Sequence, residues 1–422
     1  MKRQYIFYVL AILIVAVVAG CTDKTADNPT RPVYDENGYV WYPQPYHYEA
    51  VMMTTNGDGG SKGLAVYTPF GYNPNSGGSR PYPVLYLLTP FRQDELYYFK
   101  RGLDKVADRL IEEGKIEPMI IVCVDGQSQL GASFYTNSLA QGLFFTGLVK
   151  DTIFIDDFVG VPVQFTGYSL ITAIDSRYPT LDDRENRAIA GVGVGGYGAM
   201  KLAIETDLFS AATAVNAPLD FDGTGSGGFR SLMQNYVIPG MTWPVDTSLG
   251  DEVTSLMVSA AAAFAPHPTA LNGALTHYEL DQYNLRVFVP SVSSYLTTDS
   301  STLLTAHNAH MPFNSSGTWN NFIWGQWMAH NLDSLYVNDA YGTASGFTAM
   351  PKLLIYSDDA KFNYDEQMNS FMQFMNGNAI TYTAEKFQGS GRLDGSASNY
   401  IYDLLEDILI FHSEHFDVPD GI

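Results

Sequence analysis

The apolar positions of this chain follow two spacings that alternate along most of its length. Continuous apolar runs of four to seven residues are typical of strands that are buried on both faces of a parallel sheet. These runs lie at Gly63–Tyr67, Val84–Leu88, Met119–Val124, Ile189–Val192, Ala211–Val215, Lys352–Tyr356 and Thr381–Phe387. Segments with helical spacing separate them, at Leu103–Glu113, Leu170–Arg177, Tyr197–Glu205, Asp365–Asn376 and Tyr400–His415. The alternation predicts an α/β fold with a mostly parallel central sheet flanked by helices.

Residues 217–345 break this alternation. They contain an alanine-rich helical segment, Ser255–Phe264, and a stretch rich in tryptophan. The strand and helix pattern resumes at Lys352. We therefore predict a single domain over residues 49–416, with residues 217–345 as a cap insertion rather than a second domain.

The first 20 residues are typical of a secretion signal. Lys2 and Arg3 precede an apolar run from Tyr5 to Val18, and small residues lead to Cys21. The run is shorter than the ~20 residues of a membrane-spanning helix. The small residues before the cysteine resemble a bacterial lipobox, which implies a diacylated Cys21 at the mature N-terminus. We predict a signal peptide over residues 1–20, a tether over residues 21–48 and an extracytoplasmic lipoprotein held at a lipid bilayer; an uncleaved anchor is the alternative.

Charge and cysteine content exclude several other classes. The formal net charge is −22 among 422 residues, and such a surface repels nucleic acid. Cys123, the second of two cysteines, lies in an apolar run and is expected to be a buried thiol. No cofactor and no metal are predicted.

The most informative segment is a glycine-rich turn between a predicted strand and a predicted helix. Gly191, Gly193 and Gly195 alternate with valines directly after the strand Ile189–Val192. This layout is that of a nucleophile elbow, G-x-S-x-G, with glycine at the centre. Glycine adopts the strained backbone of such a turn at little cost, but it carries no reactive oxygen. A phosphate-binding loop is disfavoured because no Lys-Ser/Thr pair follows.

Further segments strengthen the similarity to a known family. They read YPVLYLL at 82–88, IEEGKIEPM at 111–119, IDSRYPTL at 174–181, DRENRAIAG at 183–191, GGYGA at 195–199 and AAAAFAP at 260–266. Together they resemble the esterase family of α/β-hydrolases that includes esterase D, feruloyl, acetylxylan and enterochelin esterases. The resemblance spans about residues 50–415. It implies an α/β-hydrolase fold, and a serine, an acid and a histidine in that order.

At the three triad positions this chain departs from the family. The nucleophile aligns with Gly193, and the acid aligns with Ala360, although a one-residue shift would choose Asp359. The histidine aligns with Gly391, or with Ser396 in a looser alignment. Chain order offers no replacement base, because no histidine lies between His330 and His412.

The family's oxyanion loop corresponds to Thr89, Pro90 and Phe91. Pro90 has no N–H to donate, whereas the N–H of Val194, followed by Gly195, remains. We expect these five residues to border the former acyl pocket.

The losses lead to a prediction about activity. We expect a catalytically inactive pseudo-hydrolase that binds a glycan, a small ester or a protein partner. The alternative is an active carboxylic-ester hydrolase of the feruloyl or acetylxylan type that uses a non-standard site, for which Ser169 is the nearest substitute nucleophile. A purely structural surface lipoprotein is the third possibility.

Four other features allow a functional and a structural interpretation. The loop from Asp220 to Gly228 loosely resembles a calcium loop, and His307 with His310 has a spacing seen in metal sites. Trp319, Phe322, Trp324 and Trp327 could stack on a sugar or fill the core. His412 and His415 are expected to serve packing or to lie at the surface. In each case we favour the structural interpretation.

Overall fold

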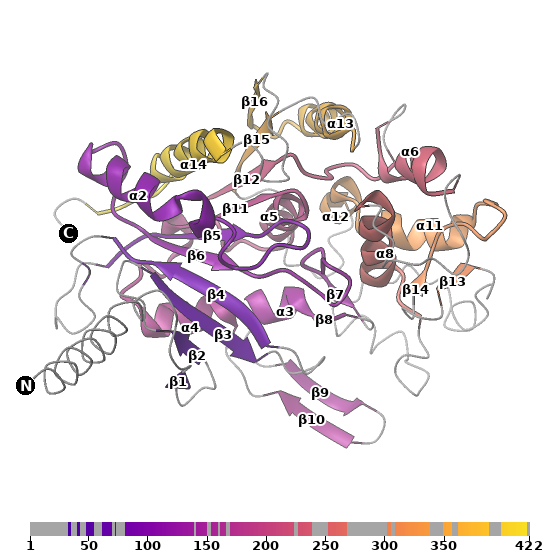
Figure 1. Cartoon of the computed structure of the whole chain (residues 1–422), viewed down its shortest axis with the longest axis horizontal. Coiled ribbons are helices and arrows are strands. Elements are labelled where there is room, and N and C mark those ends of the chain that lie inside the picture. The colour runs from indigo at the N-terminus through magenta and orange to yellow at the C-terminus, as the bar shows by residue number, and fades with distance from the viewer. Residues whose placement is uncertain are drawn as a thin grey trace, which may run out of the picture.

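The computed structural model describes the greater part of the chain. The described residues are 33–34, 40–42, 48–54, 61–69, 72, 81–138, 141–149, 153–158, 161–165, 169–222, 227–238, 252–267, 302–304, 309–337, 349–356, 362–387 and 398–419. Within them, ten strands form one sheet in the order β1-β2-β3-β4-β6-β5-β11-β12-β15-β16 (Figure 1).

Seven strands of this sheet, β4, β5, β6, β11, β12, β15 and β16, match the runs predicted from the sequence, and β1, β2 and β3 precede them. The bounds of the ten strands are Val33–Tyr34 (β1), Val40–Tyr42 (β2), Tyr48–Thr54 (β3), Ser61–Tyr67 (β4), Val84–Leu88 (β5), Ile120–Val124 (β6), Arg187–Val192 (β11), Ala211–Val215 (β12), Met350–Tyr356 (β15) and Thr383–Phe387 (β16). From β6 to β16 all neighbours are parallel, and β1 to β4 extend the sheet antiparallel. The predicted, mostly parallel sheet is confirmed.

The sheet begins earlier in the chain than we predicted. Strands β1 and β2 fall inside residues 21–48, the predicted tether, and pair with each other and with β3. Short alternating segments such as Val40–Tyr42 can complete an antiparallel edge without a long apolar run, which is why the polar composition of the tether concealed them.

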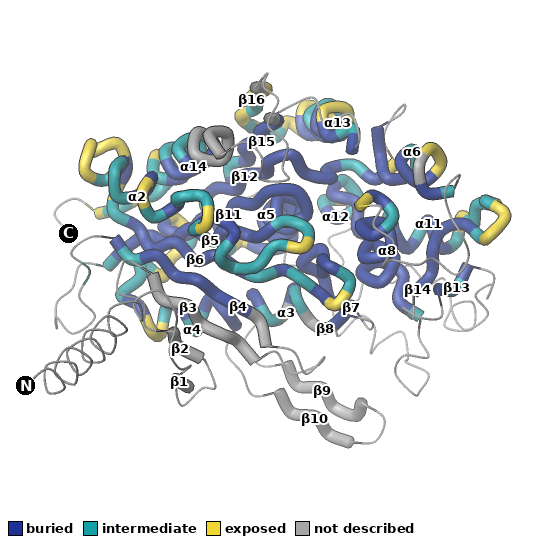
Figure 2. The backbone as a smooth tube through the Cα atoms, viewed as in Figure 1, coloured by how far each residue is buried: buried dark blue, intermediate teal, exposed yellow. Residues whose placement is uncertain are grey.

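Helices cover both faces of the sheet. Their bounds are Phe99–Arg101 (η1), Leu103–Glu112 (α2), Phe144–Val149 (α3), Leu170–Arg177 (α4), Arg184–Asn186 (η2), Val194–Glu205 (α5), Tyr364–Gly377 (α13) and Ser398–Ser413 (α14). Alternate residues of the strands belong to two separate hydrophobic clusters. One cluster packs under α2 and α14, and the other packs under α3, α4, α5 and α13. The central strands are therefore buried throughout (Figure 2).

Three short two-stranded sheets lie outside the main sheet. They pair Asn137–Ser138 (β7) with Gly142–Leu143 (β8), Ile153–Phe158 (β9) with Val161–Phe165 (β10), and Leu303–Leu304 (β13) with Ala309–His310 (β14). All three pairs are antiparallel, and none was predicted from the sequence. Two-residue strands give too little periodic signal to recognise.

The described part of residues 217–345 gathers beyond α5, on the right of Figure 1. Its helices are Phe229–Leu232 (α6), Met233–Val237 (η3), Glu252–Phe264 (α8), Asn321–Met328 (α11) and Leu332–Val337 (α12). An aromatic cluster joins this insertion to Tyr197 of α5 and to Phe134, with ring centroids 4.7–6.3 Å apart among Phe221, Phe229, Phe264 and Trp327. The insertion thus shares the core of the sheet, next to the glycine-rich turn.

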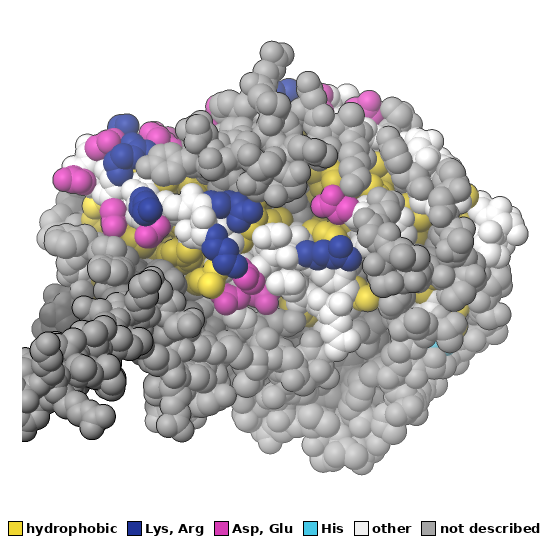
Figure 3. All heavy atoms as spheres, viewed as in Figure 1, with side chains coloured by type: hydrophobic (Ala, Val, Ile, Leu, Met, Phe, Trp, Pro, Cys, Tyr) yellow, Lys and Arg dark blue, Asp and Glu magenta, His cyan; other side chains and the backbone are white. Residues whose placement is uncertain are grey.

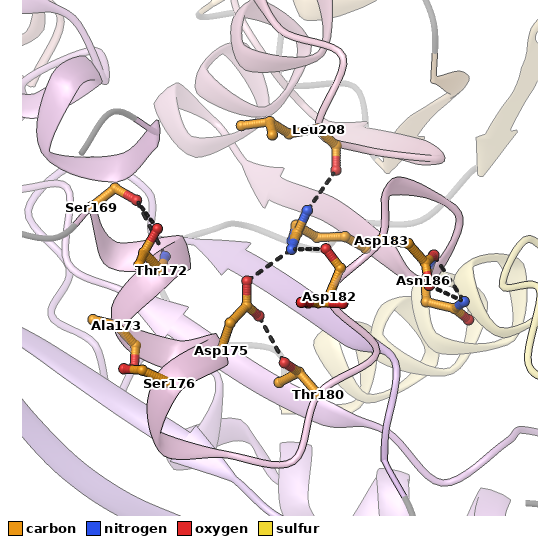
Figure 4. A network of polar contacts seen from close by, with 11 residues as sticks. Ser169, Thr172, Ala173, Asp175, Ser176, Thr180, Asp182, Asp183, Asn186 and Leu208 are labelled. Atoms are coloured by element: carbon orange, nitrogen blue, oxygen red, sulfur yellow. Dashed lines mark hydrogen bonds and ion pairs between the residues drawn. The ribbon is translucent and has the colours of Figure 1, made fainter.

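A polar network fixes the start of β11 (Figure 4). Arg187, the first residue of the strand, donates to the Asp175 carboxylate at 2.9 Å and to the Asp182 carbonyl at 2.8 Å. Asp175 also accepts from Thr180 at 2.8 Å. Burial raises the pKa of Asp175, and the adjacent Arg187 charge opposes that rise. Residues 174–181 and 183–191, two of the segments that carry the family resemblance, therefore contain residues that hold the start of β11 in place.

The described surface of the molecule carries charges of both signs. On the face drawn in Figure 3, acidic and basic side chains are interspersed, with apolar side chains between them. Among the described residues, no helix has the length and apolar character required to cross a membrane.

Candidate functional site

The glycine-rich turn has the backbone of an elbow. Gly193 stands between β11 and α5 with φ 58° and ψ −124°, a conformation that is unfavourable for residues with a side chain. Its N–H donates to the Val215 carbonyl at 2.8 Å, and its carbonyl accepts from Tyr197 N–H at 3.1 Å. The chain thus passes directly from a buried strand into a helix, as the sequence predicts.

The three alternating glycines of the turn are required for different reasons. A Cβ on Gly191 would lie 2.3 Å from the Gly195 backbone, and a Cβ on Gly195 would lie 2.2 Å from the Leu88 carbonyl oxygen. Among the residues that the structure describes, a Cβ on Gly193 would have one neighbour within 4 Å, the Pro90 Cβ at 3.6 Å. The described part of the turn therefore leaves space for a side chain at position 193, although the backbone conformation is unfavourable for one.

The loop after β5 lies against this turn. Thr89 is buried, and its hydroxyl accepts from Gly126 N–H at 3.2 Å. The Tyr135 hydroxyl donates to the Thr89 carbonyl at 3.0 Å. The structure therefore brings the predicted residues Thr89 and Pro90 together with Gly193 and Gly195, but it commits the threonine hydroxyl to internal hydrogen bonds.

Tyr135 is a residue that the sequence analysis missed. A Cβ on Gly126 would lie 2.2 Å from the Tyr135 ring, and a Cβ on Gly198 would lie 2.4 Å from it. The ring is thus in contact with backbone on both the β6 loop and α5. Burial raises the pKa of Tyr135 far above its usual value, so the phenol stays protonated and supports Thr89. Gly198, a glycine inside a predicted helix, was the available signal.

Backbone strain is concentrated at this edge of the sheet. Residues with positive φ follow β5 (Arg92, 57°), β6 (Phe134, 51°, and Tyr135, 47°), β11 (Gly193) and β12 (Asn216, 42°). Parallel strands place their carboxyl ends at one edge, where α/β proteins bind their ligands. Strained residues at such an edge are typical of functional sites.

The positions aligned with the acid and the histidine follow strands β15 and β16 in the sequence. β15 ends at Tyr356 and β16 at Phe387, and both are parallel to β12 and β11. Ala360 and Gly391, with Asp359, Ser396, His307 and Cys21, lie outside the described residues.

The C-terminal histidines serve packing. His412 is fully buried, and its Nε2 lies 3.0 Å from the Thr213 hydroxyl, on the face of the sheet opposite α5. Burial, with His415 and Lys352 nearby, lowers the pKa of His412 well below 6.5, so the ring is neutral. His415 contacts the Phe411 carbonyl at 2.7 Å through Nδ1. The structural interpretation of His412 and His415 is confirmed.

Ser169 is a helix cap. Its hydroxyl oxygen accepts from Thr172 N–H at 3.2 Å at the start of α4, and only 2% of the residue is exposed. Such an N-cap satisfies an otherwise unpaired helix N–H. This position explains the serine without a role as nucleophile.

The aromatic stretch of the insertion is mostly core. Trp324 and Trp327 are buried, while Trp319 and Phe322 are partly buried and pack against the core. The Arg230 guanidinium lies 4.8 Å from the Trp319 ring centroid. These contacts favour the structural interpretation over a sugar-stacking surface.

The proposed calcium-loop and metal-spacing features also have structural partners. Asp220 accepts from Asn331 at 3.2 Å and pairs with Ser370. His310 lies 3.0 Å from the Thr302 hydroxyl and stacks on His267. Within the described part of the chain, no group of three or more His, Cys, Asp or Glu side chains is placed to hold a metal ion.

The topology and the elbow define an α/β-hydrolase fold. The sequence model of the family described as "Putative esterase" matches residues 59–341, and the chain belongs to this family.

Individual relatives match over shorter stretches. The chain is 30% identical over 169 residues to an endo-1,4-beta-xylanase/feruloyl esterase of Xylanibacter ruminicola, covering 39% of this chain and 21% of that protein. It is 31% identical over 107 residues to endo-1,4-beta-xylanase Y of Acetivibrio thermocellus, covering 23% of this chain and 10% of that protein. The matched part thus spans 21% or less of the length of these relatives.

Solved structures are similar over nearly the whole chain. A ferulic acid esterase is 17% identical with a TM-score of 0.48, covering 88% of this chain and 100% of that one. An S-formylglutathione hydrolase from Agrobacterium tumefaciens is 14% identical with a TM-score of 0.49, covering 90% and 97%.

Proposed function

We propose that this protein is an esterase-family member without acyl-enzyme chemistry, which uses the site at the Gly193 turn to bind a ligand. The observation that carries the proposal is the conformation of Gly193. The turn keeps the strained backbone that presents a nucleophile, and it has space for a side chain, yet the residue there is glycine. Without a reactive oxygen at this point, an acyl-enzyme intermediate cannot form.

The described histidines support the proposal. His412 is held on the opposite face of the sheet by Thr213, and His415 contacts Phe411. His267 and His310 stack on each other in the insertion, and His330 stacks on Phe264 with its carbonyl bonded to Tyr197. These five described histidines are thus engaged in packing contacts, and we expect a serine at position 193 to find no base among them.

The names of the relatives suggest the ligand. Feruloyl esterase occurs in the name of the relative from Xylanibacter ruminicola. We propose that the ligand is an aromatic acyl group carried by a plant polysaccharide, and that the protein holds this group without releasing it.

The chemical test uses the full-length chain and two variants. The purified protein is treated with a short-chain chromogenic ester and with a fluorophosphonate probe. We expect no turnover and no labelling, and the same for Gly193→Ser, because a serine without a base is a poor nucleophile. Gly193→Ala is the matched control, since it adds the same backbone strain without a hydroxyl. Labelling of the unchanged chain, or ester hydrolysis by Gly193→Ser, would contradict the proposal.

The binding test compares two oligosaccharides by calorimetry. A feruloylated arabinoxylan fragment is expected to bind, and the same fragment after removal of the feruloyl group is expected to bind at least tenfold more weakly. Equal affinity for both would overturn the assignment of the acyl ligand.

We further propose that the protein is attached to a bilayer through Cys21. The sequence before this cysteine supports the proposal. Metabolic labelling with a radioactive or clickable fatty acid should tag the protein, and Cys21→Ser should abolish the tag. Cys123→Ser is the matched control because Cys123 is the chain's second cysteine and is buried. Labelling that survives Cys21→Ser would exclude this anchor.

A further inference from the structure

Arg92 is held in an unusual position at the edge of the site. It follows Pro90 and Phe91 in the loop beside Gly193, and its φ of 57° is unfavourable for a residue with a side chain. Its N–H donates to the Gly131 carbonyl at 2.9 Å, which fixes this conformation. A strained arginine that faces solvent needs an explanation beyond folding, since glycine or asparagine would occupy the position at lower cost.

The side chain of Arg92 packs against Gly131 and the Phe91 ring. A Cβ on Gly131 would lie 2.8 Å from both Arg92 Cγ and Phe91 Cε2, so the arginine stem crosses bare backbone. The guanidinium lies 4.9 Å from the centroid of the Phe91 ring. This stacking orients the planar group before any ligand arrives, which lowers the entropic cost of binding.

The Arg92 guanidinium has no ion pair and no hydrogen bond among the residues that the structure describes. By contrast, Arg109 and Arg187 in that part of the chain face carboxylates at 2.7 Å and 2.9 Å. Acidic residues outnumber basic ones by 45 to 23, so partners are abundant. An exposed guanidinium that is oriented but unpaired is suited to a carboxylate from outside the chain.

We propose that Arg92 binds a carboxylate carried by the ligand of the Gly193 turn. The proposal rests on the proposed function and narrows its ligand to an acid. That carboxylate can belong to a uronate on the polysaccharide that carries the acyl group, or to a free hydroxycinnamate, whose carboxylate exists only after its ester has been cleaved by another protein. The guanidinium would accept either one in a bidentate pair.

The test measures affinity of the full-length protein for four probes by calorimetry. The probes are ferulate, methyl ferulate, a glucuronate-bearing xylo-oligosaccharide and its neutral counterpart. We expect one of the two acids to bind at least tenfold more tightly than its neutral partner, and the preferred acid identifies the source of the carboxylate. Raising the salt concentration should lower the affinity for that acid and leave the affinities for the neutral probes unchanged.

Three variants assign the preference to Arg92. Arg92→Gln should remove the tenfold preference, whereas Arg101→Gln, a control arginine that donates to the Tyr97 carbonyl, should keep it. Arg92→Gly should also remove the preference but should raise the Tm or leave it unchanged, because glycine relieves the positive φ. A merely structural arginine would instead lower the Tm when replaced by glycine.

Each outcome bears on the proposal. Absence of an acid preference, or its persistence in Arg92→Gln, overturns the role of Arg92; if the feruloylated fragment still binds, the proposed function stands. An Arg92-dependent acid preference without any binding of the feruloylated fragment supports Arg92 and overturns the acyl ligand. No binding of any of the four probes overturns the role of Arg92.

Discussion

The two ends of strand β11 are fixed in opposite ways. At its start, Arg187 is held by the Asp175 carboxylate and by backbone carbonyls, so the position depends on paired side chains. At its exit, Gly191, Gly193 and Gly195 have no side chains, and two of them are in backbone contact where a Cβ cannot fit. The start of the strand is held by an ion pair and hydrogen bonds of side chains, whereas its end requires residues that have no side chain.

The difference between the two ends distinguishes residues that the fold requires from a residue that it does not require. The pairing at Arg187 and the close approach at Gly195 both serve the fold, and both are present. The central residue of the turn is not required by packing among the described residues, because a Cβ there would meet Pro90 alone, at 3.6 Å. A change at position 193 is therefore the one that the scaffold tolerates best.

The largest expected effect is at the start of the strand. Arg187→Met should lower the free energy of unfolding by about 3 kcal/mol or more, because it leaves the largely buried Asp175 carboxylate without its partner. Urea denaturation followed by circular dichroism measures the change.

Arg184→Met is the control for this measurement. Arg184 pairs with the exposed Glu185 at 3.4 Å, and such surface pairs contribute less than about 1 kcal/mol. Equal losses for the two variants would show that the buried pair does not hold this end of β11.

At the exit of the strand, two alanine variants should differ. Gly195→Ala places a Cβ 2.2 Å from the Leu88 carbonyl oxygen, and overpacking of this kind typically costs about 1–3 kcal/mol. Gly193→Ala meets no clash with the described residues and adds backbone strain of roughly 1–3 kcal/mol, which the turn can partly relax. We expect the Gly195 variant to be the less stable in the same denaturation assay; the reverse order would mean that the turn relaxes around position 195.

The smallest effect concerns a histidine that acts on stability instead of catalysis. The pKa of His412 is lowered in the folded state, so the unfolded chain binds more protons below pH 6.5. Its contribution is present above that pH and is lost as the pH falls, by up to about 1.4 kcal/mol per pH unit. Denaturation at pH 7.5, 6.5 and 5.5 measures the slope.

His412→Gln should flatten this slope. His267, whose pKa burial also lowers, adds a slope of the same sign and remains in the variant. An unchanged slope in His412→Gln would mean that burial of the ring does not suppress its protonation.

Much of the fold could be predicted from residue patterns, because buried parallel strands require continuous apolar runs. Val84–Leu88, Ala211–Val215 and Leu170–Arg177 have the predicted bounds in the structure. The two-residue strands and the hairpin of β9 and β10 were missed. Short strands that pair outside the main sheet lack the apolar run that marks a buried one.

The site could be predicted only in part. The Gly193 turn was evident because glycine, strand and helix signals are local. The ring of Tyr135 between Gly126 and Gly198, and the positive φ of Arg92, depend on contacts between loops that are distant in sequence. The spacing of apolar residues along the chain does not indicate such contacts. For the same reason the sequence could not place His412 on the far face of the sheet.

The small opening beside Gly193 also makes this position an attachment point. Gly193→Cys would add a thiol facing Pro90, with the next described atoms beyond 4 Å from its Cβ. Thiol-bearing fragments could then be captured there by disulfide exchange, and mass spectrometry would rank them by the extent of capture. Fragment capture at position 193 would thereby show which small molecules bind beside the turn.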